Sequence, residues 1–322
     1  MAMERRDFIK GSAIIGATIL TPAIIKASGL LSSMSERKVH KVISADRTMI
    51  QTLPLLRSFA GDDTDFVSPY VVFDEFGPIN IKPHNPIRVD AHPHAGIIPM
   101  TYFLSGTGHH RDSLNNDYQY GKSDFLVFTS GKGAIHMEET GQKIYDEGGL
   151  YHGFQIWLNL PKRFKFIDPS TVMYHKSQMG LVQTNTYSAK VVFGEGFGVK
   201  SEIAMLFPVF YYHITLNENS KLEIPTDPTH NAFIYVIDGE LEVQGNKAIQ
   251  KNQMVLYERN ADYINVFSKK KTEFLVLGGK PNNEPVYSYG PFVMNTRDEV
   301  MQCMSDYNSG KMGNPEVVNG NK

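Results

Sequence analysis

The feature that most constrains the fold is a block of short apolar runs that occurs twice, about 130 residues apart. Residues 101–128 and residues 234–257 each contain an apolar run, a glycine turn, a polar loop and a second apolar run, with the turns at Gly106 and Gly239. Two copies of one block predict a tandem pair of domains and not a solenoid, which stacks more repeats.

The runs themselves have the length and residue types of β-strands. Apolar segments are separated by Gly, Asn, Asp and Pro, which is typical of a β-sandwich or β-barrel. The clearest runs are residues 100–104, 125–129, 155–158, 233–237 and 274–277. We therefore predict an all-β fold, with a first domain over residues 45–180, a second over residues 195–313, and an interdomain turn at residues 193–198.

One helix is predicted, close to the C-terminus. Thr296 and Glu299 have the spacing of a capping box, and apolar residues at helical spacing follow them from Val300 onward. Gly310 is placed to end this helix.

Charge and cysteine content exclude several classes of function. The 32 basic residues nearly balance the 34 acidic ones, so the net charge is −2. Such a balance predicts no nucleic acid partner and no binding to an anionic membrane face. Cys303 is the only cysteine, which excludes an intrachain disulfide and every metal site built from several cysteines. The 11 histidines leave imidazole as the candidate metal ligand.

The spacing of the histidines in residues 92–152 predicts a metal site. His92 and His94 stand on either side of a proline, so both imidazoles leave the same face of an extended segment. His136 and Glu138 repeat this spacing about forty residues later. Two such pairs on neighbouring strands would offer three nitrogens and one oxygen to one ion, with adjacent positions left open on an octahedral metal such as Fe(II).

Neighbouring residues have other interpretations. A single His-x-His pair is weak evidence, because this pattern also occurs at turns and barrel mouths. His109 and His110 alternate faces in a predicted hairpin, so at most one points inward, and we leave both out of the ligand set. We expect His152 to belong to the core and Glu139 to face solvent.

The second copy of the block serves as an internal control. The offset from Gly106 to Gly239 places the counterparts of the two pairs near residues 225–227 and 263–265, which offer no comparable ligand set. A purely structural need would recur in both copies, so the histidines of the first copy are predicted to be functional.

The N-terminus resembles a twin-arginine export signal. Arg5 and Arg6 precede Phe8, Lys10 and an uncharged run over residues 11–25. This run is shorter than the ~20 apolar residues that span a bilayer. We predict export by the twin-arginine route to the periplasm or another extracytoplasmic space, with cleavage at residues 27–29. An uncleaved segment that tethers the protein to the membrane is the alternative.

Five ordered motifs resemble the pirin family of bicupins. They are residues 89–96, 110–113, 131–138, 155–161 and 289–296. The resemblance covers about residues 45–313 and implies two tandem cupin (jelly-roll) β-barrels with a short C-terminal helix. Pirins hold one iron in the N-terminal barrel through three histidines and a glutamate. Carried over by motif, the implied ligands are His92, His94, His136 and Glu138.

This resemblance also implies a function. The expected activity is that of a dioxygenase, like quercetin 2,3-dioxygenase, acting with O2 on flavonol-like or other enolisable aromatic substrates through one Fe(II)-type ion. Glu138 would be the catalytic base. Mn, Co, Ni, Cu and Zn also suit such ligands. The alternative is a non-catalytic metal-binding or redox-sensing protein that acts through a protein partner. The sequence sets no oligomeric state.

Two positions depart from the pirin pattern. Where the family carries an arginine and a glutamate after its second histidine, this chain has Ala95 and Ile98. Loss of both residues keeps the local charge balanced. It nevertheless predicts altered surroundings for the metal and an altered pocket mouth.

Overall fold

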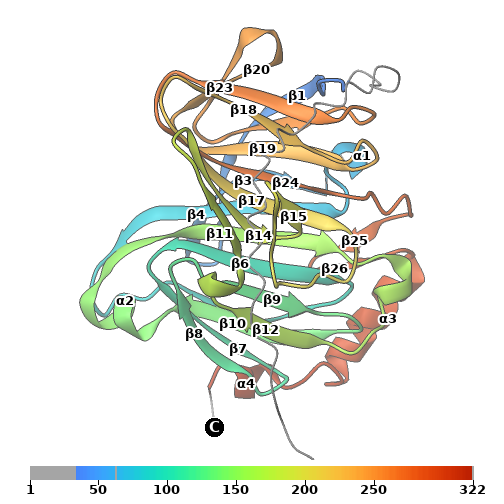
Figure 1. Cartoon of the computed structure of the whole chain (residues 1–322). Coiled ribbons are helices and arrows are strands. Elements are labelled where there is room, and N and C mark those ends of the chain that lie inside the picture. Colours follow the sequence, from blue (N-terminus) through green and yellow to red (C-terminus); the bar gives the residue numbers. More distant parts are fainter. Residues whose placement is uncertain (1–33, 62–63, 321–322) are drawn as a thin grey trace, which may run out of the picture. The chain divides into compact units, whose positions relative to one another are not determined.

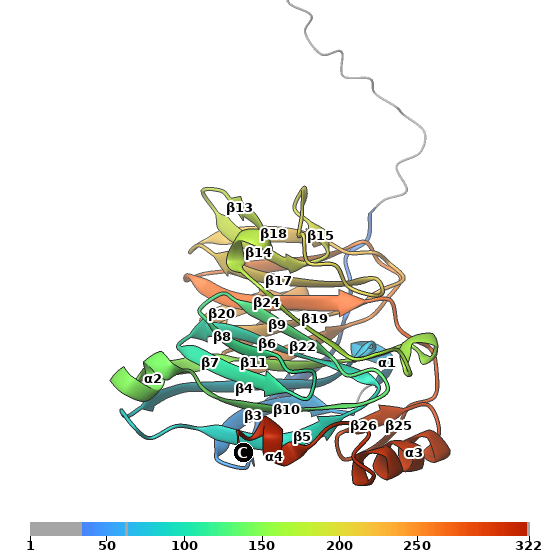
Figure 2. The ribbon, with the colours of Figure 1, turned by 90° about the horizontal axis from the view of Figure 1, so that it is seen from below.

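Two barrels make up the described chain, and each consists of one seven-stranded and one four-stranded sheet whose strand pairs are antiparallel. The computed structural model describes residues 34–61 and 64–320 (Figures 1 and 2). The predicted export signal lies outside these residues. All five predicted runs lie in strands, so the all-β prediction is confirmed.

The first barrel is built from two sheets. In spatial order, the seven-stranded sheet consists of β12 (Ser170–Tyr174), β9 (Phe125–Thr129), β6 (Ile97–Ser105), β11 (Gly149–Asn159), β4 (Tyr70–Ile81), β3 (Leu53–Ala60) and β2 (Asp46–Ile50). The four-stranded sheet consists of β5 (Arg88–His94), β10 (Ala134–Thr140), β7 (Thr107–Asp112) and β8 (Asp117–Gly121).

The second barrel repeats this order of strands. Its seven-stranded sheet consists of β1 (Val39–Ser44), β22 (Gln253–Tyr257), β19 (Asn231–Asp238), β24 (Thr272–Gly279), β17 (Val209–Leu216), β14 (Tyr187–Phe193) and β13 (Gly180–Gln183). Its four-stranded sheet consists of β18 (Ser220–Pro225), β23 (Tyr263–Ser268), β20 (Glu240–Val243) and β21 (Lys247–Gln250).

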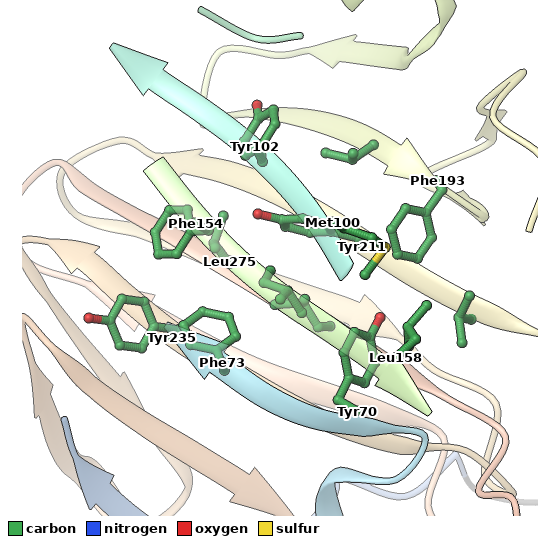
Figure 3. Close-up of a cluster of buried hydrophobic side chains, with 14 of the residues drawn as sticks. Tyr70, Phe73, Met100, Tyr102, Phe154, Leu158, Phe193, Tyr211, Tyr235 and Leu275 are labelled. Atoms are coloured by element: carbon green, nitrogen blue, oxygen red, sulfur yellow. The ribbon is translucent and has the colours of Figure 1, made fainter. Parts of the chain in front are cut away.

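The central strands read as continuous apolar runs because both of their faces are covered. One face of each seven-stranded sheet points into its own barrel, and the opposite face packs against the large sheet of the other barrel. Figure 3 shows the resulting layer between the barrels, with Tyr70, Phe73 and Phe154 from the first barrel near Tyr211 and Tyr235 from the second. The rings of Phe73 and Tyr235 lie 4.9 Å apart between centroids. This shared core joins the two barrels.

Two features of the chain path correct the sequence-based expectations. Residues 193–198 are not an interdomain turn: Phe193 ends β14, and the hairpin of β15 (Glu195–Gly196) and β16 (Val199–Lys200) follows inside the second barrel. The chain passes from the first large sheet to the second at residues 175–179. In addition, β1 pairs with β22, so the first described strand belongs to the second barrel.

The C-terminal segment returns to the first barrel after completing the second. It contains β25 (Tyr287–Tyr289), β26 (Phe292–Met294), α3 (Arg297–Asn308) and α4 (Pro315–Val318). Thr296 and Glu299 make the predicted capping box, which confirms the helix (Figure 1). The Val293 N–H donates to the Ala95 carbonyl at 3.1 Å, beside the end of β5.

Two further helices are short, α1 (Thr64–Val67) and α2 (Gln142–Glu147). Within the described part of the chain, no helix has the length and apolar character needed to cross a membrane.

Candidate metal site

The three predicted histidine ligands come together on adjacent strands of the small sheet in the first barrel. His92 and His94 lie on β5, and His136 lies directly opposite His92 on β10. One ring nitrogen from each of the three lies within 4.8 Å of those of the other two. The i, i+2 spacing thus places both β5 imidazoles on one side of the strand, where His136 meets them.

Hydrogen bonds to the backbone set the tautomers of two of these histidines. His92 Nδ1 donates to the Asp90 carbonyl at 2.8 Å, and His94 Nδ1 donates to the Pro291 carbonyl at 3.3 Å. With the proton on Nδ1, each Nε2 keeps a lone pair that can bind a metal. The His94 acceptor comes from the C-terminal segment, 197 residues along the chain.

Burial keeps the three imidazoles neutral. It lowers the pKa of His92, and lowers the pKa values of His94 and His136 further, with repulsion between the neighbouring rings acting in the same direction. A metal requires the neutral form of the ring, so the environment favours ligation over protonation.

Glu138 faces the same cavity as His92 but is held by a different set of contacts. Thr101 and Tyr120 donate hydroxyl hydrogen bonds to Glu138 Oε1 at 2.8 and 3.2 Å, and Gln155 Nε2 donates to Oε2 at 3.2 Å. A Glu138 carboxylate oxygen lies within 4.8 Å of ring nitrogens of His136 and His110, and it does not join the group formed by His92 and His94. The structure thus places Glu138 at the wall of the site, linked to the histidine triad through His136.

His110 is the site residue that sequence reasoning left out. Its side chain is fully buried, and its ring centroid lies 5.3 Å from that of His136. His110 Nε2 donates to Asp112 Oδ2 at 3.1 Å, which leaves the Nδ1 lone pair directed away from Asp112. The sequence contains the pattern His-x-Asp at residues 110–112, which is a local sign of an oriented histidine. The register of β7 against β10 places His110 opposite Glu138, and this register shows which of the two adjacent histidines points inward.

Asp112 is fixed by several donors besides His110. Burial alone would raise its pKa, but hydrogen bonds from His110, Thr171 and Asn116 outweigh this effect and lower the pKa to about 2. A carboxylate that stays ionised in the interior holds His110 in a single tautomer and orientation.

The other histidines of this region and Glu139 lie outside the site. His109 pairs with Asp117 at 2.8 Å and with Glu139 at 3.1 Å. Glu139 also contacts Arg88 at 3.2 Å, so it belongs to an ion cluster, and the expectation that it simply faces solvent is wrong. His152 bonds Glu75 through Nε2 at 2.6 Å, and Tyr235 of the second barrel donates to the same carboxylate. His152 is thus part of the contact between the barrels.

Ala95 and Ile98 do not shape the pocket mouth, contrary to the expectation from the family pattern. Ala95 is buried beside Phe292 of the C-terminal segment, and Ile98 packs in the core between the barrels. Neither lines the cavity beside His92 and Glu138. Their backbone directs these two side chains away from the histidine triad.

A buried lysine secures the turn that follows His94. Lys165 Nζ donates to the carbonyls of Gly96 and Val293 and to the side-chain oxygen of Asn159. Burial lowers its pKa to about 7, although the charges of Glu284 and Glu299 act in the opposite direction. Lys165 thereby ties the end of β5 to the C-terminal segment.

The donor set suits a bound cation. The buried nitrogens His94 Nε2, His136 Nδ1 and His136 Nε2 have no hydrogen-bond partner among the described residues. Leaving a buried polar atom unpaired costs about 1–3 kcal/mol, and one cation would provide a partner for His94 Nε2 and for the His136 nitrogen that carries no hydrogen. Neutral imidazoles with a nearby carboxylate match the ligand preferences of Fe, Ni, Cu and Zn, and do not select one of them.

Comparison with protein families gives two matches that together cover both barrels. The family model for pirin matches residues 52–158, and that for the pirin C-terminal cupin domain matches residues 211–313. A pirin-like protein of Solanum lycopersicum is 30% identical over 278 residues, which is 85% of this chain and 92% of that protein. Pirin of Rattus norvegicus is 27% identical, over 87% of this chain and 94% of that protein.

Solved structures show the same architecture. A quercetin 2,3-dioxygenase from Acinetobacter baumannii superposes with a TM-score of 0.84 at 25% identity, covering 87% of this chain and all of that one. The bacterial pirin YhhW from Escherichia coli, solved in complex with nickel(II), superposes with a TM-score of 0.54 at 17% identity, covering 75% of this chain and 99% of that one. The second likeness concerns the fold alone.

Proposed function

The chain belongs to the pirin family of bicupins. From this membership we propose that it is a metal-dependent dioxygenase that acts on an enolisable substrate. Flavonol-like and other enolisable aromatic compounds are the first class to test. The observation that carries this proposal is the triad of His92, His94 and His136, with His92 and the Glu138 carboxylate on the wall of a cavity. The similar quercetin 2,3-dioxygenase from Acinetobacter baumannii supports the choice of reaction.

In this proposal the three histidines and Glu138 hold one divalent ion, most simply Fe(II). The ion supplies Lewis acidity and a common binding position for the two reactants. Glu138 accepts the hydroxyl proton of the substrate at Oε2. This oxygen accepts one hydrogen bond, from Gln155, whereas Oε1 accepts two, from the hydroxyls of Thr101 and Tyr120. Gln155 holds the same carboxylate from the other side and fixes its plane.

Oxygen uptake by the iron-loaded protein tests this proposal. The full chain is loaded with Fe(II) anaerobically, and oxygen consumption is then followed across a panel of flavonols, catechols and compact enolisable ketones. Consumption with at least one of them is expected. Full metal occupancy without consumption on any of them would instead support a metal-binding or redox-sensing protein that acts through a partner.

Substitution at two adjacent glutamates separates the role of Glu138 from a general effect of charge. Glu138→Gln is expected to retain much of the metal and to lose turnover, because an amide cannot accept the substrate proton. Glu139→Gln is the matched control, since Glu139 belongs to the ion cluster with His109 and Arg88. Equal turnover in the two variants would contradict the role proposed for Glu138.

The proposal includes export by the twin-arginine route. Arg5 and Arg6, followed by an uncharged run, support it. Cell fractionation of the full chain tests it: the wild-type chain should reach the periplasm, and a chain with Arg5→Lys and Arg6→Lys should stay in the cytoplasm. Equal distribution of the two chains would contradict export by this route.

A further inference from the structure

The His110 imidazole is buried beside the histidine triad with one ring nitrogen unused. The residue is 0% exposed, and its Nδ1 has no hydrogen-bond partner within the part of the chain that the structure describes. Its Nε2 carries the proton, because the carboxylate of Asp112 only accepts hydrogen bonds. Nδ1 therefore holds a buried lone pair, which is free to bind a cation or to accept a proton.

Asp112 is anchored firmly enough to hold this ring in place. Its Oδ1 accepts the backbone N–H groups of Leu114 at 2.9 Å and Asn116 at 3.1 Å, and the Thr171 hydroxyl donates to Oδ2. Histidines that bind metals donate their second ring N–H to a carboxylate, a backbone carbonyl or water, and this contact fixes the ring. His110 thus has the outer contact of a metal ligand.

His110 belongs to a second group of donor atoms that overlaps the triad. Ring nitrogens of His110 and His136 and a carboxylate oxygen of Glu138 all lie within 4.8 Å of one another. The pairing of β7 with β10 brings them together, since it sets His110 opposite Glu138. His136 belongs to both groups, and neither of its ring nitrogens has a partner among the described residues.

From this geometry we infer that the first barrel holds a second metal position, formed by His110, His136 and Glu138. Two imidazoles and one carboxylate are the donor set of a 2-His-1-carboxylate site, which takes divalent transition-metal ions. Because His136 is common to both positions, one ion per chain occupies either this position or the histidine triad. The inference rests on the proposed function only for the presence of a metal, and it holds whether or not the protein consumes oxygen.

Titration of the metal-free full chain with Co(II), followed by visible absorption, tests the second position. The double variant His92→Ala with His94→Ala removes two donors of the triad and leaves the second position intact. It should still bind one Co(II) per chain, more weakly than wild type. Adding His110→Ala to the double variant should weaken this residual binding at least about tenfold. In the wild-type background, His110→Ala should change the affinity for Co(II) by less than about threefold, because the triad remains.

The adjacent histidine provides a matched control. His109 lies on the same strand but contacts Asp117 and Glu139 in the ion cluster. His109→Ala, added to the double variant, should leave the affinity for Co(II) unchanged. Should the variant with His110→Ala fail to fold, His110→Gln replaces it, since its amide N–H can still donate to Asp112 while the imidazole is absent.

Electron paramagnetic resonance separates ligation from a structural role of His110. The double variant loaded with Cu(II) should show coupling to two imidazole nitrogens, from His110 and His136. Adding His110→Gln should reduce this number to one. A residue that only supported the fold would not change the number of coupled nitrogens.

The outcomes also separate this inference from the proposed function. No Co(II) binding by the folded double variant, or equal binding with and without the His110 imidazole, would overturn the second position. Two Co(II) ions bound to one wild-type chain would contradict the alternation at His136. Absence of oxygen uptake by the iron-loaded chain would contradict the proposed reaction and leave the second position standing.

Discussion

The two barrels share one order of strands but differ in what equivalent strands carry into the interior. In the first barrel, β5 and β10 present His92, His94, His136 and Glu138. In the second, the equivalent pair β18 and β23 presents an aliphatic set that is buried in the core of that barrel, Leu222, Ile224, Ile264 and Val266. The second barrel therefore lacks a comparable ligand set on these strands, as the repeat predicts.

The difference shows that this fold does not need polar residues at these positions. Aliphatic side chains close the second barrel by packing alone. The first barrel instead carries buried nitrogens without a partner in the described part of the chain, which destabilise the folded state unless a ligand binds them. The polar side chains of the first barrel therefore weaken its packing, whereas the aliphatic side chains of the second barrel strengthen it.

The largest expected effect is the loss of metal from the first barrel. His92→Ala or His136→Ala should weaken metal binding at least about a thousandfold, which is about 4 kcal/mol, because each removes one of three clustered nitrogens. Elemental analysis of purified protein measures it, with His109→Ala as the control from the surface ion cluster. Full occupancy in either site variant would disprove the site.

A truncation in the second barrel should affect stability and leave the metal in place. Ile264 is fully buried on β23, so Ile264→Ala should lower the free energy of unfolding by about 3 kcal/mol through the cavity it creates. Urea titration measures this loss, and metal content serves as the control. Loss of metal at unchanged stability would break the division of roles between the barrels.

The pH dependence of stability should reveal the carboxylate that orients His110. Asp112 has a pKa of about 2 in the folded chain against 3.8 normally, so its ionised form stabilises the fold above about pH 4 and this contribution is lost as the pH falls toward 2. At pH 7, Asp112→Asn should cost about 2 kcal/mol. Unfolding titrations of both proteins should show this difference shrinking below pH 4. A difference that stays constant with pH would contradict this prediction.

The smallest effect is expected from making the first barrel resemble the second. In protein treated with a chelator, His136→Leu removes two buried nitrogens that have no partner among the described residues, and it should change stability by no more than about 1 kcal/mol, in the stabilising direction. Thermal unfolding of the two metal-free proteins measures it. A loss above about 2 kcal/mol would show that His136 has a structural role of its own.

Much of the fold followed from local patterns in the sequence. The repeated block, the apolar runs and the capping box at Thr296 each depend on residues close together in the chain. The same holds for His92 and His94, whose spacing alone places both rings on one side of β5.

What the sequence did not reveal depends on contacts between distant residues. The inward position of His110 is set by the register of β7 against β10. The position of Ile50 and Leu53 beside the cavity depends on the hairpin of β2 and β3, which is hydrogen-bonded to β5. The expectation for Ala95 and Ile98 rests on their closeness in sequence to His94, whereas the backbone after His94 turns both side chains away from the cavity.

The contact of Pro291 with His94 has a consequence for the order in which the site is completed. The His94 imidazole donates to a carbonyl that is synthesised 197 residues later, and Lys165 joins the turn after His94 to Val293 of the same late segment. During synthesis, the C-terminal segment that contains Pro291 and Val293 leaves the ribosome after both barrels. The hydrogen bond that orients the His94 imidazole therefore forms only after the C-terminal segment, the last part of the chain to be synthesised, has docked on the first barrel.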